Sequence, residues 1–258
     1  AKLTTALAAG VRFAGTLTVT GISGDTEKAA ALTAFTASKT GASTVTLTAD
    51  GAWSVAGSTL KAALDDGVLL VGTLTVTDIT GDTDKAAALT DFTAPKTGAT
   101  NVTLTANDNA WQIATGNLTT ALATNAAKIK FASTDTITVT GITGNTDKAA
   151  ALTAYTAPLT GANTVILTAD DNAWTIATAK LTTALATDGA KIKFADTDDL
   201  TVTGITGNTD KAAALTAYTA PLTGAKSVIL TADDNAWEIA TAKLTTALAA
   251  GVRFAGTL

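Results

Sequence analysis

The segment KIKFADTDDLTVTGITGNTDKAAALTAYTAPLTGA, residues 191–225, contains the pattern that decides the fold. It begins with two short stretches of β-forming residues separated by a polar turn, and an Ala-rich stretch follows them. In the related phrase TLTVT, residues 16–20, threonines alternate with Leu17 and Val19. A period of two is typical of a strand that buries one face. We therefore predict the order strand, turn, strand, short helix.

The ends of the predicted helices carry matching signals. GNTDKAAAL, residues 207–215, supplies Asn, Thr and Asp where a helix start needs side-chain oxygens for its free amides. Pro158 and Pro221 follow at the points where we expect the helices to stop. In a second type of helix Leu181 and Leu185 are four residues apart, which predicts a narrow apolar stripe.

The same order recurs along the whole chain. SVILTADDNAWEIATAKLTTALAAG, residues 227–251, again predicts strand, turn, strand and helix, so the elementary module is a ββα unit. Four tryptophans in variants of LTADDNAW are 58, 63 and 63 residues apart. The chain thus consists of about eight modules in four tandem units of roughly 60 residues. The units are 16–72, 73–135, 136–198 and 199–256.

The fold class follows from the shortness of these helices. A helix of two or three turns is marginal alone, so packing against neighbouring strands must stabilise it. We predict an α/β repeat protein, an elongated solenoid in which a sheet layer carries short packed helices. Two alternatives stay open. The two strands of a module form either a hairpin or a solenoid corner, and successive helices lie on one face of the sheet or, if modules alternate in direction, on both.

The two ends of the sequence are identical. AKLTTALAAGVRFAGTL occurs as residues 1–17 and again as residues 242–258, which implies a super-repeat of 241 residues. We interpret residues 1–258 as a single continuous repeat array that resembles a window cut from a periodic protein. Its partners are then other copies or repeats of itself, joined end to end either covalently or by stacking.

Composition excludes several classes of function. The net charge is −5 and the pI is about 4.6, which disfavours nucleic acid and anionic membrane as partners. No apolar run approaches the ~20 residues of a membrane-spanning helix. The chain has no His and no Cys, and its carboxylates recur in turns instead of converging once. We therefore expect no enzyme activity, no catalytic residue and no cofactor apart from the calcium ion considered next.

Acidic turns are the candidate metal sites. Carboxylates in such turns are ligands that Ca²⁺ accepts. Their spacing matches neither the EF-hand nor the Gly-rich nonapeptide repeats, and Asp and Asn also make tight turns without a metal. The candidate Ca²⁺ ligands are Asp170, Asp171, Asp196, Asp198, Asp233 and Asp234.

Repeated aromatic and hydroxyl side chains are candidates for surface recognition. An exposed row of the four tryptophans would stack on sugars, whereas buried indoles would fill the core, and the scarcity of other aromatic residues favours the core. The equivalent residues Phe35, Phe92, Tyr155 and Tyr218 invite the same interpretation. A regular Thr array would suit ice or glycan, although Thr is also the best polar strand former.

The recurring phrases resemble those of very long Thr- and Ala-rich repeat proteins on bacterial surfaces. The phrases are TLTVTGITG, KAAALTAYTA and TAKLTTALA, in close variants along the whole chain. The likeness to giant adhesins, extracellular filament proteins and surface-layer proteins implies an extracellular or cell-surface location. We expect a structural protein that forms a rod, filament, adhesin stalk or coat. The alternative is a module whose Thr or Trp ladder binds ice, glycan or another surface.

Overall fold

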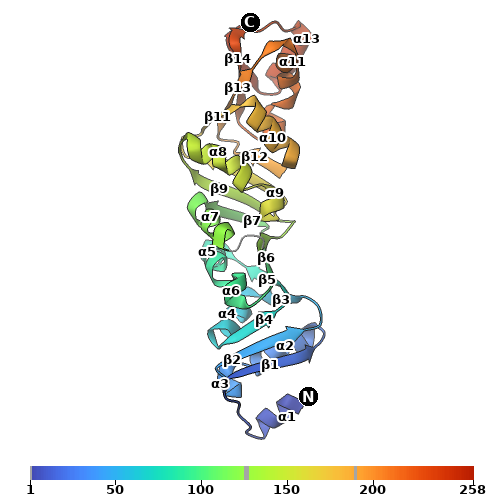
Figure 1. The fold of residues 1–258 in the computed structure, drawn as a ribbon. Helices are drawn as coiled ribbons and strands as arrows, with labels where there is room; N and C mark the ends of the chain where they lie inside the picture. Colours follow the sequence, from blue (N-terminus) through green and yellow to red (C-terminus); the bar gives the residue numbers. More distant parts are fainter. Residues whose placement is uncertain (1, 125–127, 189–190) are drawn as a thin grey trace. The chain divides into compact units, whose positions relative to one another are not determined.

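The computed structural model describes residues 2–124, 128–188 and 191–258, and Figure 1 shows its elements along the chain. The fold is mixed α/β, with four small parallel sheets and short helices. The chain divides into two compact units. The first comprises 1–110 and 119–135, and the second comprises 111–118 and 136–258. Each unit is described by itself.

The first unit contains two sheets. One has the strand order β1-β2-β4 and the other has the order β3-β5-β6-β8. Every strand neighbour pair in both sheets is parallel. The strands are β1 (Thr16–Ile22), β2 (Thr44–Ala49), β3 (Trp53–Ala56), β4 (Val68–Val71), β5 (Thr73–Ile79), β6 (Asn101–Ala106) and β8 (Ile129–Phe131).

The second unit repeats this arrangement. Its sheets have the strand orders β7-β9-β10-β12 and β11-β13-β14-β15, and the pairings between its described residues are also parallel. The strands are β7 (Ala110–Ala114), β9 (Thr136–Ile142), β10 (Thr164–Ala169), β11 (Ala173–Ala177), β12 (Ile192–Phe194), β13 (Asp199–Ile205), β14 (Ser227–Ala236) and β15 (Val252–Thr257).

Short helices connect the strands. Each helix of the described residues has between four and eleven residues, and the sequence also predicts short helices. The helices are α1 (Lys2–Ala8), α2 (Asp25–Ala34), α3 (Ala37–Thr40), α4 (Gly57–Asp65), α5 (Gly81–Asp91), α6 (Ala94–Thr97), α7 (Thr115–Thr124), α8 (Gly144–Ala154), α9 (Ala157–Thr160), α10 (Thr178–Asp188), α11 (Gly207–Ala217), α12 (Ala220–Thr223) and α13 (Thr241–Ala249).

The two strands of a module lie in different sheets. β10 pairs with β9 and β12, whereas β11, which follows after a three-residue turn, pairs with β13. A hairpin would require antiparallel pairing of β10 with β11. The hairpin alternative is therefore wrong, and the polar turn is a corner at which the chain passes from one sheet to the next.

Successive helices lie side by side. α8 and α10 contact each other and both contact β11, and α2 and α4 show the same relation to β3 (Figure 1). The idea that modules alternate in direction, which would send helices to opposite faces, is wrong because the strands of each sheet are parallel. In each of these pairs the two helices pack side by side against the same strand.

The strand alternation predicted from the sequence is confirmed. In β13 the side chains of Leu200 and Val202 are fully buried, whereas Thr201 and Thr203 are half-buried. In the adjacent strand Val228 is also fully buried, and it lies opposite Leu200 in the ladder. Registered rows of aliphatic residues thus form the core of each sheet.

The predicted helix signals act differently from our expectation. α8 begins at Gly144, so Asn, Thr and Asp lie inside its first turn, and no side chain caps its amides. The hydroxyl of Thr143 instead donates to Asp147 at 3.2 Å. α8 ends at Ala154, before the proline, and Pro158 lies in the first turn of α9. A proline is tolerated there because the backbone N–H that it lacks would have no acceptor within the first turn of the helix.

Candidate functional sites

The acidic turn between β10 and β11 has a strained backbone that Asn accommodates. Asn172 adopts a left-handed conformation with φ 53°, and its counterparts Asn109 and Asn235 have φ 54° and 55°. The first copy of the turn is one residue shorter and has Gly51 at φ 83°. Asn and Gly are the residues that tolerate this region most readily. The turn composition therefore has a conformational explanation.

The same turn supplies a carboxylate to a buried lysine. Lys148 on α8 is buried, and its Nζ lies 2.7 Å from both carboxylate oxygens of Asp171. The ammonium also lies 6.0 Å from the ring centroid of Trp174. The hydrogen bond from Lys148 holds the pKa of Asp171 below its usual value. The cluster ties a helix, a corner and a strand together.

Three of the four tandem copies contain this lysine–aspartate pair. The Nζ–carboxylate distance is 2.7 Å in Lys85–Asp108 and 2.6 Å in Lys211–Asp234. In the first copy the shorter turn lacks the aspartate, and Lys28 donates to the carbonyl of Ala52 at 2.7 Å instead. A buried ammonium thus keeps an acceptor in every copy, as the cost of burying an unpaired charge requires.

Asp198 is a buried structural carboxylate. Its Oδ2 accepts hydrogen bonds from the backbone N–H of Ala169 at 2.7 Å and from the indole Nε1–H of Trp174 at 2.8 Å. Its Oδ1 accepts from the hydroxyl of Thr197 at 3.0 Å. The fully buried Asp135 accepts from the backbone N–H of Ala106 in the same way. These carboxylates join neighbouring corners of the fold.

Two other copies dispense with the buried carboxylate. There a glycine, Gly72 or Gly256, stands at the position of the aspartate, and the indole N–H donates to a backbone carbonyl. Trp53 donates to Val71 at 3.1 Å, and Trp237 donates to Ala255 at 3.2 Å. Sequence analysis did not predict this role; the signal that could have indicated it is aspartate at 135 and 198 where the other copies have glycine.

The six candidate calcium ligands do not converge. Asp170, Asp196 and Asp233 are exposed, Asp171 and Asp234 are paired with lysines, and Asp198 is buried among the donors described above. Among the described residues no group of three or more His, Cys, Asp or Glu side chains has an arrangement that would hold a metal ion. The turns therefore show structural contacts for three of the six aspartates.

The tryptophans belong to the core. Trp53, Trp111, Trp174 and Trp237 are between 0 and 5% exposed, so the core interpretation is confirmed and an exposed Trp ladder is wrong. The equivalent aromatics Phe92, Tyr155 and Tyr218 are also buried, whereas Phe35 is half-buried.

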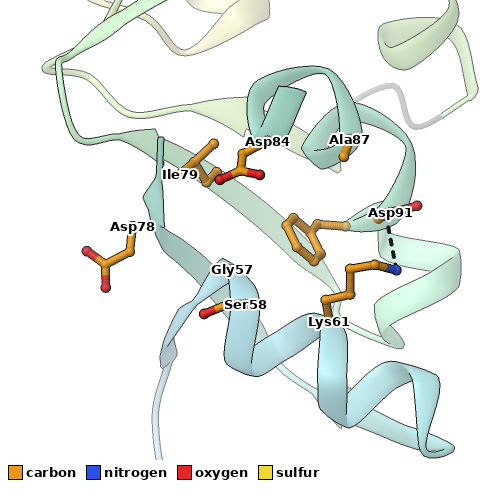
Figure 2. A pocket seen from close by; sticks show the side chains of 9 residues that line it. Gly57, Ser58, Lys61, Asp78, Ile79, Asp84, Ala87 and Asp91 are labelled. Atoms are coloured by element: carbon orange, nitrogen blue, oxygen red, sulfur yellow. Dashed lines mark ion pairs between the residues drawn. The ribbon is translucent and has the colours of Figure 1, made fainter. Parts of the chain in front are cut away.

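A pocket of about 220 Å³ lies between α4 and α5 in the first unit (Figure 2). Figure 2 shows Lys61 directed towards Asp91, and their Nζ and Oδ2 atoms are 3.5 Å apart. The carboxylate of Asp65 raises the pKa of Lys61, which keeps the amine protonated. A protonated amine is not a nucleophile. Phe92 and Ile79 supply apolar walls.

This pocket occupies the place of a hydroxyl pair in the second unit. There Tyr218 and Thr178 have hydroxyl oxygens 2.8 Å apart, and Tyr218 also bonds the hydroxyl of Thr182. In the first unit the counterparts are Phe92 and Gly57, which carry no hydroxyl. The pocket is thus a local variation in packing between two helices.

Sequence reasoning missed one recurring buried side chain. The hydroxyl of Thr160 at the end of α9 donates to the carbonyl of Thr156 at 3.1 Å and accepts from the N–H of Ala162 at 3.4 Å. It satisfies backbone groups beyond a short helix. The four fully buried threonines of this kind are Thr40, Thr97, Thr160 and Thr223.

Comparison with known proteins adds no relative. No protein-family model matches the chain, and no curated protein matches it. In the part of the chain that the structure describes, no helix is both long enough and apolar enough to cross a bilayer.

Proposed function

We propose that this protein is a structural, extracellular repeat protein. Its ββα modules form an elongated solenoid that serves as a rod or filament, in a cell-surface fibre, an adhesin stalk or a coat. Identical repeats join end to end, either within one polypeptide or by head-to-tail stacking.

The division of each module between two sheets carries this proposal. In the second unit β10 and β12 belong to one sheet, while β11, which lies between them in sequence, belongs to the next. Because consecutive strands of one chain belong to both sheets, the two sheets separate only if strands of one sheet break their hydrogen bonds to the neighbouring strands. Such interlocking suits a protein that transmits load or spans a distance, because resistance is distributed over many backbone hydrogen bonds.

The repetition of the same buried contacts also favours a structural role. The lysine–aspartate pair and the buried tryptophan recur from copy to copy with nearly constant geometry. A binding or catalytic centre usually depends on residues that occur once. Here the recurring polar groups contact each other and the backbone, and they stabilise the fold of each repeat.

The alternative is a surface-binding module with a Thr face. In the second unit the row across one sheet runs from Thr138 to Ile166 and Lys193, so the hydroxyls do not form a continuous ladder. In the first unit the half-buried Thr75 and Thr103 lie side by side, and their row continues to Lys130. This row is the surface that an ice or glycan ligand would use.

Electron microscopy of the purified chain tests the proposal. We expect continuous fibres or linear oligomers whose length grows with protein concentration. Discrete particles of one chain at all concentrations would contradict the filament and favour the binding module. In that case, binding to ice or to immobilised glycans would be the next measurement.

A further inference from the structure

The two identical terminal segments lie in different environments. At the C-terminal end β15 pairs with β14, and Val252 is fully buried. At the N-terminal end α1 buries no side chain, residues 11–14 form no strand, and Val11 is 44% exposed. Because the sequences are the same, the difference comes from the strand beside them.

β1 has one free edge among the described residues. Its counterparts β5 and β13 each lie between two strands, and one of these neighbours contains the buried tryptophan. Among the described strands, β2 is the one partner of β1. Accordingly Leu17 is half-buried and Thr18 is exposed, whereas the counterpart Leu200 is fully buried. The free edge of β1 corresponds to the edge at which β5 and β13 pair with a tryptophan-containing strand.

Residues 236–240 present the complementary strand. Their sequence AWEIA repeats AWTIA of β11, which pairs along its length with β13. Here only the start is paired, since the N–H of Trp237 donates to the carbonyl of Thr257 at 2.8 Å. Ile239 is half-buried although its counterpart Ile176 is 5% exposed. On the helix that follows, Leu248 is 42% exposed.

We propose that copies of this chain join by exchange of these identical segments. Residues 2–17 of one copy take the place that residues 243–258 fill in another, and β1 then continues along residues 236–240. This inference rests on the proposed function, because it specifies the contact by which copies stack head to tail.

The exchange conserves the contacts that it displaces. The incoming segment has the sequence of the segment it replaces, so the helix and strand contacts at that place are equivalent. The gain is the new pairing of β1 and the burial of Leu17 and Ile239. Exchange of an identical element is a low-cost route to assembly, and a head-to-tail contact of this kind need not close.

The internal copies define the register of the joint. Thr175 lies opposite Thr201 in the second unit, and the counterparts of these residues are Glu238 and Thr18. Likewise Ile229 lies opposite Arg253, whose counterpart is Arg12. The proposal therefore places Thr18 of one copy beside Glu238 of the next, and Arg12 beside Ile229.

Cysteine cross-linking in the 258-residue chain tests this register, since the natural sequence has no cysteine. Thr18 and Glu238 are exposed, so the double variant Thr18→Cys/Glu238→Cys should keep the fold. On mild oxidation we expect a ladder of disulfide-linked oligomers in steps of 25.5 kDa. The matched control is Thr46→Cys/Glu238→Cys, because Thr46 lies one strand further from the edge, opposite Thr18. It should give no ladder.

A second pair separates exchange from simple edge pairing. Arg12→Cys/Ile229→Cys should also give intermolecular disulfides, because these positions meet only if the terminal segments exchange. A ladder from the first pair alone would overturn exchange. Fibres under the microscope with no ladder from either pair would overturn it as well, while leaving the proposed function standing. Ladders from both pairs, with closed rings under the microscope in place of fibres or linear oligomers, would support exchange and contradict the filament.

Discussion

At the scale of single residues, the recurring requirement is a partner for each buried polar group. Asp198 accepts from a backbone amide and an indole, Lys148 donates to Asp171, and Asn172 takes a left-handed turn. Asp198 and Lys148 connect elements that are distant in sequence, and Asn172 makes the tight turn between β10 and β11. Their substitution should therefore affect stability more than substitution of exposed neighbours.

Removal of the Asp198 carboxylate should destabilise the second unit. Asp198→Ala leaves two buried N–H groups without an acceptor, and the expected loss is about 3 kcal/mol. Asp198→Asn keeps one acceptor oxygen and should cost less, and the exposed Asp196→Ala is the control. Chemical denaturation followed by tryptophan fluorescence measures the three variants. Equal effects of Asp198→Ala and Asp196→Ala would contradict the structural role.

The left-handed turn should discriminate sharply between substitutions. Asn172→Val places a β-branched residue at φ 53° and should cost about 1–2 kcal/mol. Asn172→Gly should be nearly neutral, because Gly51 already serves this purpose in the first copy. The measurement is the urea midpoint of each variant. A valine that is tolerated as well as glycine would refute the conformational argument.

The lysine–aspartate pairs should make the stability of the folded chain depend on pH in the acidic range. The pKa values of Asp108, Asp171 and Asp234 are lowered chiefly by hydrogen bonds from the lysines. A carboxyl with a lowered folded-state pKa stabilises above its unfolded value of about 4 and loses this stabilisation as pH falls through the folded pKa. The melting temperature should therefore decrease when the pH is lowered below about 4. The double variant Asp171→Asn/Asp234→Asn should show a weaker fall, whereas Asp170→Asn should behave as the natural chain.

Residue types alone did not reveal which aspartates are buried. Asp196 and Asp198 occur two residues apart in one polar turn, yet the first is exposed and the second fully buried. The difference depends on Trp174 and Ala169, which reach Asp198 from residues 24 and 29 positions earlier. The residues next to Asp198 in the sequence do not indicate that the fold brings these two distant residues to its carboxylate.

At the scale of elements, alternation and composition were sufficient to place strands and short helices. They were insufficient to pair the strands. A polar turn joins β10 to β11 whether they form a hairpin or a corner, and the decision lies in ladders such as Thr164 opposite Thr136. The helix starts were misplaced because Gly144 itself enters the helix, ahead of the residues that have capping side chains.

The tyrosine contact between α10 and the residue after α11 should contribute measurably to helix packing. Tyr218→Phe removes the hydroxyl that bonds Thr178 and should cost about 1 kcal/mol. A double-mutant cycle with Thr178→Ala should give a coupling energy of about 0.5–1.5 kcal/mol. Phe92→Tyr in the first unit is the matched control, since Gly57 offers no side-chain hydroxyl. A coupling energy of zero would show that the hydrogen bond between the two hydroxyls does not contribute to stability.

At the scale of the whole molecule, we infer that a strand such as β15 forms because a strand of the preceding module, here β14, lies beside it. The terminal segments are a natural experiment, because the same residues form β15 at one end and no strand at 11–14. Sequence identity suggested that the ends are interchangeable. Only the structure shows that one of them is packed and the other is not. This dependence on a neighbouring strand agrees with the proposed filament.

Amide hydrogen exchange of the two identical segments measures how far each segment depends on a neighbouring strand. Their intrinsic exchange rates are equal, so any difference reports structure alone. At a concentration where the chain is monomeric, we measure peptides that include the unique residues flanking each segment. We expect slow exchange at residues 252–255 and fast exchange at residues 11–14. Equal protection of the two segments in the monomer would contradict this dependence.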